Sequence, residues 1–450
     1  MNWNTLLTPL RFGSEERPHK KNYSEEFERT QFQRDYDRIV FSSPFRRLQN
    51  KTQVFPLPGS ILVHNRLTHS LEVACVGRSL GSMLSAKLKH DEQYKQNIYI
   101  DQIGDIVAAA CLAHDMGNPA FGHSGEKAIS QYFFENYENL KSYVTEAEWA
   151  DLTHFEGNAN ALRLLTHKFN NRPEGPFGLT YPTLAAIVKY PCESLAGRDK
   201  GNIHRKKFGF FSSEKDTFER IAKALGILKT QDSPSTYCRH PLAYLVEAAD
   251  DICYNIIDIE DAHRLNIFTD SEVLELLLPL CGDEKQKTEE RLAKLTDSND
   301  KISLLRAKSI SMLTQLMSDA FWKHHDEILK GELLTDLKSR LPEEYRQQLS
   351  VIEKISNERI YNYRSVVEKE IAGYKIIGGL LEEFVPIILA EERSHYQKKL
   401  MLLFPQQFMP TSNSVYNKIQ AVLDFVSGMT DLFAVELYKR IKGTSFPEFS

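Results

Sequence analysis

One segment of the sequence combines histidines and carboxylates at spacings that suit phosphoryl chemistry. LAHDMGNPAFGHSGE, at residues 112–126, places His114 and Asp115 at the end of an apolar run and then adds His123 and Glu126. An ionised aspartate at the buried end of a helix costs several kcal/mol unless it is paired or bound to a metal. A metal site therefore explains this pair of residues better than packing does.

Four side chains make up the predicted metal site: His69, His114, Asp115 and one aspartate of the pair Asp250 and Asp251. A single histidine on an apolar face is more often a core residue, but several such residues together favour a site. Imidazoles with carboxylates suit a divalent ion such as Mg, Mn, Co, Ni or Fe, whereas a structural zinc site would use cysteines. On a helical wheel Asp250 flanks the apolar stripe and Asp251 lies nearly opposite, so Asp250 is the better ligand.

The segment after Asp250 adds a ring and a second carboxylate to the same helix face. Tyr254 and Asp258 follow Asp250 at four and eight residues, which is the spacing of neighbours on a helix surface. Taken alone, such a pattern belongs more often to an exposed acidic helix face than to a binding site.

The elements that must position these residues are predicted to be helices. Apolar residues recur mostly with the helical period, and β-branched clusters are short, so we expect a mainly α protein. Gly117 and Pro119 would end the helix that carries His114. The expected helices run from about residue 65 into the eighties, from 103 to 114, from Pro241 to 264, and onward from Gly122.

Outside these helices, the sequence predicts loops and one exposed segment. We expect residues 1–60 to be irregular because of their prolines, and residues 170–215 to form a long loop with a short hairpin or two. Residues 283–301 read as an exposed helix and turn, and a soft structural division is expected near 265–280.

Composition sets broad bounds. The 450 residues, with 42% hydrophobic and 26% charged content, match a soluble globular protein, and no apolar run approaches the roughly 20 residues of a membrane span. The N-terminus does not read as a signal peptide, and we expect a cytoplasmic protein. Scattered cysteines indicate buried free thiols; they are Cys75, Cys111, Cys192, Cys238, Cys253 and Cys281.

The charge balance argues against a surface built entirely for nucleic acid, because the formal net charge is -5. Two local basic clusters remain, PFRRLQNK at 44–51 and HRKKF at 204–208. Each could be a solvated loop or part of a pocket for a small polyphosphate.

Five long motifs together resemble the dGTP triphosphohydrolase family, the dNTPase branch of the HD superfamily. They occur in the family's order and cover the chain from about 40 to 440. The motifs are NRLTHSLEV (65–73), AHDMGNPAFGHSGE (113–126), HFEGNANALRLL (154–165), LVEAADDICYNIIDIEDA (245–262) and VLDFVSGMTDLFA (422–434).

The resemblance implies an all-α HD fold with an additional C-terminal helical layer. It also implies an enzyme that splits a deoxynucleoside triphosphate, with dGTP favoured, into deoxynucleoside and inorganic triphosphate. By motif, the metal ligands are His69, His114, Asp115 and Asp250. The catalytic pair is His123 and Glu126, whose i, i+3 spacing would let the carboxylate orient the imidazole.

Two further groups of residues match family positions that contact substrate. Arg66, His154, Lys189 and Tyr190 would surround the polyphosphate, whose negative charge needs such donors.

The sugar contacts are implied in the same way. Tyr254 would occupy the space that a 2′-hydroxyl needs, while Gln53 and Asp258 would bind the 3′-hydroxyl. Asn158 would either contact substrate or cap a turn.

The resemblance also suggests an organisation of the chain. Residues 1–60 would contribute to the active site, 61–270 would form the HD catalytic core, and 271–450 would pack on the core and assist oligomerisation. This last region is matched mainly at NERIYNYRSVVEKEIAGYKII (357–377) and VLDFVSGMTD. A hexamer is expected from the family, with single-stranded DNA or a nucleotide as a possible effector, and no membrane partner.

Two alternative functions compete with this reading. An HD phosphohydrolase could act on another nucleotide or a nucleic-acid end, but such enzymes need none of Glu126, Tyr254 and Asp258. A catalytically silent regulatory or single-strand-binding HD protein is expected to have lost metal ligands, and all four are present.

Overall fold

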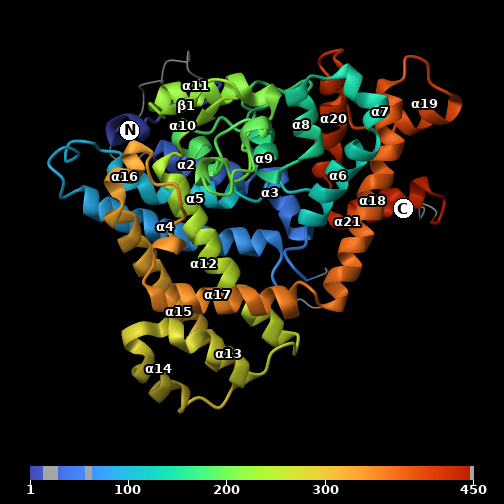
Figure 1. Ribbon diagram of the computed structural model, residues 1–450. Helices are drawn as coiled ribbons and strands as arrows, with labels where there is room; N and C mark the ends of the chain where they lie inside the picture. The colour runs from blue at the N-terminus through green and yellow to red at the C-terminus, as the bar shows by residue number, and fades with distance from the viewer. Residues whose placement is uncertain (14–28, 56–62, 446–450) are drawn as a thin grey trace.

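The computed structural model describes residues 1–13, 29–55 and 63–445 and is almost entirely helical (Figure 1). Within these ranges the only strands are β1 (Lys229–Gln231) and β2 (Thr236–Tyr237), which pair as a short antiparallel hairpin. The predicted all-α class is confirmed.

A central helix, α5 (Ile103–Ala113), organises the first half of the chain. Nearly all of its side chains are buried, as expected of a helix that is apolar all round. It is surrounded by α2 (Gln31–Val40), α4 (Arg66–Leu88), α10 (Tyr181–Ile187) and α12 (Pro241–Arg264). Helices α4, α5 and α12 match the three helices predicted from the apolar periodicity.

Helices α4 and α5 run antiparallel at very close range. A Cβ atom added to Gly81 of α4 would lie 2.8 Å from the Cα atom of Gly104 of α5, so the two backbones approach as closely as glycine allows. The N-terminal end of α4 therefore lies beside the C-terminal end of α5. This places the His69 and His114 rings 5.5 Å apart, centroid to centroid.

A second hydrophobic cluster joins the middle of the chain to its C-terminal layer. Helix α18 packs along α6 and also contacts α20 and α21, at the right of Figure 1. The main helices of this cluster are α6 (His123–Glu135), α8 (Glu146–Thr153), α9 (Gly157–Thr166), α18 (Arg364–Leu389), α20 (Val415–Ser427) and α21 (Asp431–Ile441).

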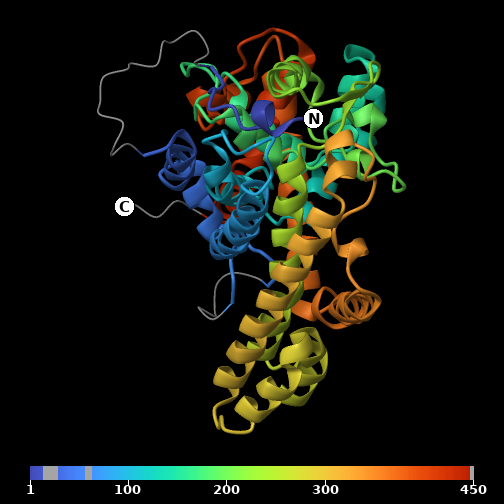
Figure 2. The same cartoon turned by 90° about the vertical axis from the view of Figure 1, so that its left-hand side faces the viewer.

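A lobe formed by α13 (Asp270–Leu277), α14 (Lys285–Leu292) and the start of α15 (Ser298–Lys323) projects from the rest of the protein (Figures 1 and 2). Helix α15 then returns to pack on α12 and α4. The remaining helices are α1 (Trp3–Leu6), α3 (Ser43–Arg47), α7 (Tyr137–Leu140), α11 (Lys215–Leu225), α16 (His325–Lys330), α17 (Glu343–Ile355), the π turn Ser356–Ile360, and α19 (His395–Met401).

Residues 283–301 contain α14 and a turn, as predicted. The division of the chain at residues 60 and 270 stays a prediction.

All six cysteines are free, and five of them are buried. Among the helices of the described residues, none has the length and apolar character needed to cross a membrane.

Two predictions of irregular structure are wrong in part. Within residues 1–60, the stretch from 31 to 47 forms α2 and α3, with Pro44 in the first turn of α3. Within residues 170–215, α10 likewise carries Pro182 in its first turn, and the hairpin lies outside this region, at 229–237. Proline in a first turn costs no hydrogen bond, so these prolines begin helices instead of marking loops.

The close approach of α4 and α5 leads to a stability prediction. Gly81→Ala places a methyl group against the Gly104 backbone, and we expect a loss of roughly 1–3 kcal/mol in the free energy of unfolding. Urea denaturation measures it. Gly378→Ala is the control, because open space surrounds that helical position; it should be neutral or stabilising by up to about 1 kcal/mol. Equal effects at the two positions would contradict the packing argument.

Candidate active site

A large cleft, with a cavity volume of about 580 Å³, is lined by members of both hydrophobic clusters. Its walls come mainly from α4, α6, α12, α18 and the segment that follows α5. Most of the predicted site residues line it: Gln53, Arg66, His114, Asp115, His123, Glu126, Asn158, Lys189, Tyr190, Asp250 and Tyr254.

His69, His114 and Asp250 form a compact group at one wall of the cleft. One ligand-capable atom from each lies within 4.8 Å of the others. The Asp250 Oδ1 atom is 3.1 Å from His69 Nε2 and 3.4 Å from His114 Nε2. Nδ1 of His114 lies 2.6 Å from the Cys111 carbonyl oxygen, and a proton donated there would leave the Nε2 lone pair directed at the group.

Salt bridges hold the carboxylate of Asp250 and that of the neighbouring Asp115, which is not part of the compact group. Arg66 Nη1 lies 2.7 Å from Asp115 Oδ2, and Lys189 Nζ lies 2.6 Å from Asp250 Oδ2. Burial raises the pKa of Asp115, but the charges of Arg66, His114 and His69 together outweigh burial and hold the pKa below its usual range. Lys189 and the two histidines together have the same effect on the pKa of Asp250. Asn118 adds a hydrogen bond of 2.5 Å to Asp115 Oδ1. Both carboxylates therefore stay ionised.

His123 and Glu126 form a hydrogen-bonded pair at the first turn of α6, as their spacing predicted. His123 Nδ1 lies 2.7 Å from Glu126 Oε2, and the other oxygen of Glu126 accepts a hydrogen bond from the Gly157 amide at 2.7 Å. The His123 side chain is 74% exposed, whereas Glu126 is buried. Burial would raise the pKa of Glu126, but the bond to His123 lowers it. The carboxylate can thus orient an accessible imidazole.

A third group combines Tyr254 and Asp258 of α12 with Tyr361, which follows the π turn. The Tyr254 and Tyr361 rings stack with centroids 5.8 Å apart, and the Tyr361 hydroxyl donates to Asp258 Oδ2 at 2.7 Å. Burial raises the pKa of Asp258 to about 7, although this hydrogen bond opposes the shift. Nearby, Gln53 lines the cleft, and its buried Oε1 accepts no hydrogen bond from any described residue.

His154 lies in a side pocket instead of the main cleft. The side pocket and the cleft share four wall residues, His123, Glu126, Lys127 and Lys207. Arg198 donates to His154 Nε2 at 2.6 Å. Burial and the charge of Arg198 lower the pKa of His154. His69 and Asp258 lie behind the cleft wall, in contact with residues that line it.

Several cleft residues were missed by the sequence analysis. Asn118 belongs to the quoted HD motif, Lys207 to the basic cluster 204–208, and Tyr361 and Lys369 to the motif at 357–377. Each of these residues lies within a motif or cluster quoted above, but the sequence does not indicate which residues of a motif face the cleft. Asn158 lines the cleft and hydrogen-bonds to the carboxylate of Glu156 at 3.3 Å.

Comparison with known proteins supports the resemblance drawn from the motifs. Residues 66–189 match the HD domain, and residues 339–440 match the phosphohydrolase-associated domain. The HD match includes the segments that carry His69, His114 and His123.

Full-length relatives extend this match. A deoxyguanosinetriphosphate triphosphohydrolase-like protein of Synechocystis is 38% identical, with 99% of this chain and 100% of the relative covered. One from Pseudomonas aeruginosa is 37% identical with the same coverage. A deoxyguanosinetriphosphate triphosphohydrolase of Yersinia enterocolitica is 29% identical, covering 95% of this chain and 97% of the relative. The chain therefore belongs to the deoxyguanosinetriphosphate triphosphohydrolase-like family of HD-domain hydrolases.

Proposed function

We propose that the protein is a metal-dependent enzyme that hydrolyses deoxynucleoside triphosphates, dGTP favoured, to deoxynucleoside and inorganic triphosphate. The observation that carries the proposal is one cleft bordered by the His69, His114 and Asp250 group, the His123 and Glu126 pair, and the stacked tyrosines. The names of the relatives point to the same reaction. A hexamer and a response to single-stranded DNA or an effector nucleotide remain predictions from the resemblance.

The donor set suits a divalent ion. The buried Nε2 of His114 makes no hydrogen bond within the described chain, although it lies beside Asp250 and 3.6 Å from Asp115 Oδ1. His69, His114 and Asp250 would hold the ion, with Asp115 as the fourth ligand. When bound, the ion would stabilise negative charge at the α-phosphorus and make water more acidic.

The cationic wall would bind the triphosphate. Arg66, Lys189 and Lys207 line the same cleft, and a substrate with about four negative charges needs such donors. Arg66 can present a planar fork to phosphate oxygens, while Lys189 supplies a point charge. Tyr190 stacks against the buried Arg239, whose guanidinium lies 5.2 Å from the ring centroid, and is thereby fixed at the cleft wall.

His123 would move the proton that the reaction requires. Hydrolysis adds water at the α-phosphorus, breaks the bond to the 5′ oxygen, and delivers a proton to that oxygen. The exposed imidazole can exchange a proton with the water or with the departing oxygen, while Glu126 holds its Nδ1 side.

The stacked tyrosines would select the sugar. Tyr361 stacks on the Tyr254 ring, and both line the cleft, so a ribose 2′-hydroxyl would have to displace a stacked aromatic pair. The unpartnered Oε1 of Gln53 can accept a hydrogen bond from the 3′-hydroxyl. Asp258 lies on the same side of α12, held by Tyr361.

Product analysis tests the proposed reaction. The protein is first stripped with a chelator and then supplied with Mg, Mn or Co and each dNTP; we expect metal-dependent release of intact triphosphate. Monophosphate or pyrophosphate would support a different HD phosphohydrolase, and no product with any metal would support a silent regulator. Asp250→Ala should lose bound metal, whereas Asp251→Asn, at a position outside the ligand group, should keep it.

Replacing the proton-transfer residue should separate chemistry from metal binding. We expect His123→Ala to lower kcat by roughly 10²–10⁴-fold with unchanged metal content, because His123 is not part of the ligand group. His90→Ala, at an exposed position on the protein surface, is the control and should retain full activity. Near-normal turnover of the His123 variant would remove His123 from the mechanism.

Sugar selection is tested at Tyr254. We expect Tyr254→Ala to admit ribonucleotides, narrowing the ratio of kcat/KM for dGTP over GTP by about tenfold or more, since a steric block of this size is worth about 1–3 kcal/mol. The exposed Tyr363 provides the control substitution, Tyr363→Ala. An unchanged ratio in the Tyr254 variant would place sugar selection elsewhere.

A further inference from the structure

A buried carboxylate outside the cleft holds together two segments that carry predicted site residues. Asp431, the first residue of α21, is 7% exposed and does not line the cleft. Its Oδ2 atom accepts hydrogen bonds from the Thr52 amide at 3.0 Å and the Thr52 hydroxyl at 2.5 Å, and its Oδ1 atom accepts one from the Phe121 amide at 3.0 Å. Both oxygens are therefore engaged by the segments that lead to Gln53 and His123.

The segment at Phe121 needs such support. Phe121 and Gly122 have positive φ angles of 62° and 59°, a region that costs a bulky residue about 1 kcal/mol or more. This turn immediately precedes His123, so its conformation sets the direction in which α6 begins. A Cβ atom on Gly122 would lie 2.5 Å from Arg66 Nη2, which shows how tightly the turn packs against the cationic wall of the cleft.

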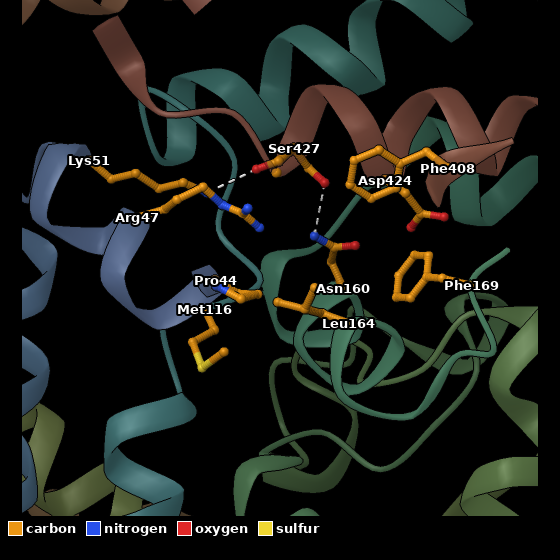
Figure 3. A pocket seen from close by; sticks show the side chains of 11 residues that line it. Pro44, Arg47, Lys51, Met116, Asn160, Leu164, Phe169, Phe408, Asp424 and Ser427 are labelled. Carbon is orange, nitrogen blue, oxygen red and sulfur yellow. Dashed lines mark hydrogen bonds between the residues drawn. The ribbon is translucent and has the colours of Figure 1, made fainter. Parts of the chain in front are cut away.

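Two lysines bind the same segments to the C-terminal layer. Lys51 Nζ donates to the carbonyl oxygen of Ser427 at 2.9 Å (Figure 3). It also donates to the carbonyl oxygen of Asn118 at 2.5 Å. Lys369 of α18 donates to the Val54 carbonyl oxygen at 2.8 Å. Thr52 and Val54, on either side of Gln53, are thus both held from the C-terminal layer.

The contact at Ser427 has a further branch. Asn160 Nδ2 donates to Ser427 Oγ at 3.2 Å (Figure 3). It also donates to the Gly117 carbonyl oxygen at 2.7 Å. Residues 427–431, at the link from α20 to α21, are therefore joined to both ends of the 117–122 turn. Asp431 contacts Phe121 directly, whereas Ser427 is connected to Gly117 and Asn118 through Asn160 and Lys51. The hollow drawn in Figure 3 beside this link contains none of the predicted site residues.

We propose that Asp431 is a positioning residue, which aligns Gln53 with the 3′-hydroxyl and His123 with the reacting phosphate by fixing Thr52 and Phe121 at a common anchor. The inference rests on the proposed function. Three donors converge on two carboxylate oxygens, so an amide cannot replace the carboxylate: either orientation of an asparagine would set its NH₂ group against at least one of these donors.

The test compares Asp431→Asn with the wild-type protein at equal metal content and well below the melting temperature of the variant. We expect kcat for dGTP to fall at least about tenfold, since misplacement by about 1 Å can cost roughly 100-fold. The kcat/KM preference for dGTP over 2′,3′-dideoxyguanosine triphosphate should also narrow, because Gln53 no longer meets the 3′-hydroxyl. In amide hydrogen exchange, Thr52 or Phe121 should lose protection while α5 keeps it.

Asp424→Asn is the matched control for a purely structural role. Asp424 is a buried carboxylate of the same layer, 2.7 Å from Arg163, and lies outside the cleft. The Asp424→Asn substitution should lower the melting temperature without changing the kcat/KM preference for a substrate with a 3′-hydroxyl. If Asp431→Asn does not fold, Thr52→Val removes the hydroxyl bond alone and should narrow the same preference.

The outcomes separate the two proposals. Wild-type protein that releases no triphosphate from dGTP would overturn the proposed function, and hydrogen exchange would still test the anchor. Active wild-type protein with an Asp431→Asn variant that keeps its kcat within about twofold, its 3′-hydroxyl preference and its amide protection would overturn the positioning role.

Discussion

Charged groups buried in a helical interior must be paired, and this constraint shapes the site. Asp115 after α5 pairs with Arg66 of α4, and Asp250 of α12 pairs with Lys189 after α10. Each salt bridge joins two elements, so the electrostatic requirement also fixes the geometry of the helices. The close backbone packing of α4 against α5 makes this possible, because it brings the polar ends of both helices to one place.

Much of the helical framework could be predicted from the sequence, because its signals are local. The apolar period of α4, α5 and α12 and the breakers after His114 are read within a few turns of chain. The failures at α3 and α10 have one physical cause. Proline is frequent both in loops and in the first turn of a helix, and only the residues that follow it distinguish the two cases.

The site was predictable where its residues share an element or a motif. His123 with Glu126, and Asp250 with Tyr254, follow from spacing along a helix. Tyr361 was missed because its partner Asp258 lies 103 residues away, and no period connects the two. The side pocket around His154 depends in the same way on Arg198, which a different segment supplies. Such contacts are set by tertiary packing, which a single sequence does not display.

The anchor at Asp431 has a consequence for the time at which the enzyme is completed. Thr52 and Asp431 are 379 residues apart in the chain, so the segment at Thr52 gains this contact only when the start of α21, the last helix of the described residues, has been synthesised. The groups that could hold a metal all precede residue 251, and they can meet much earlier during synthesis. If Asp431 positions the site as proposed, a growing chain would acquire the groups that could bind a metal well before it could align a nucleotide, and hydrolysis would begin only when the polypeptide is nearly finished.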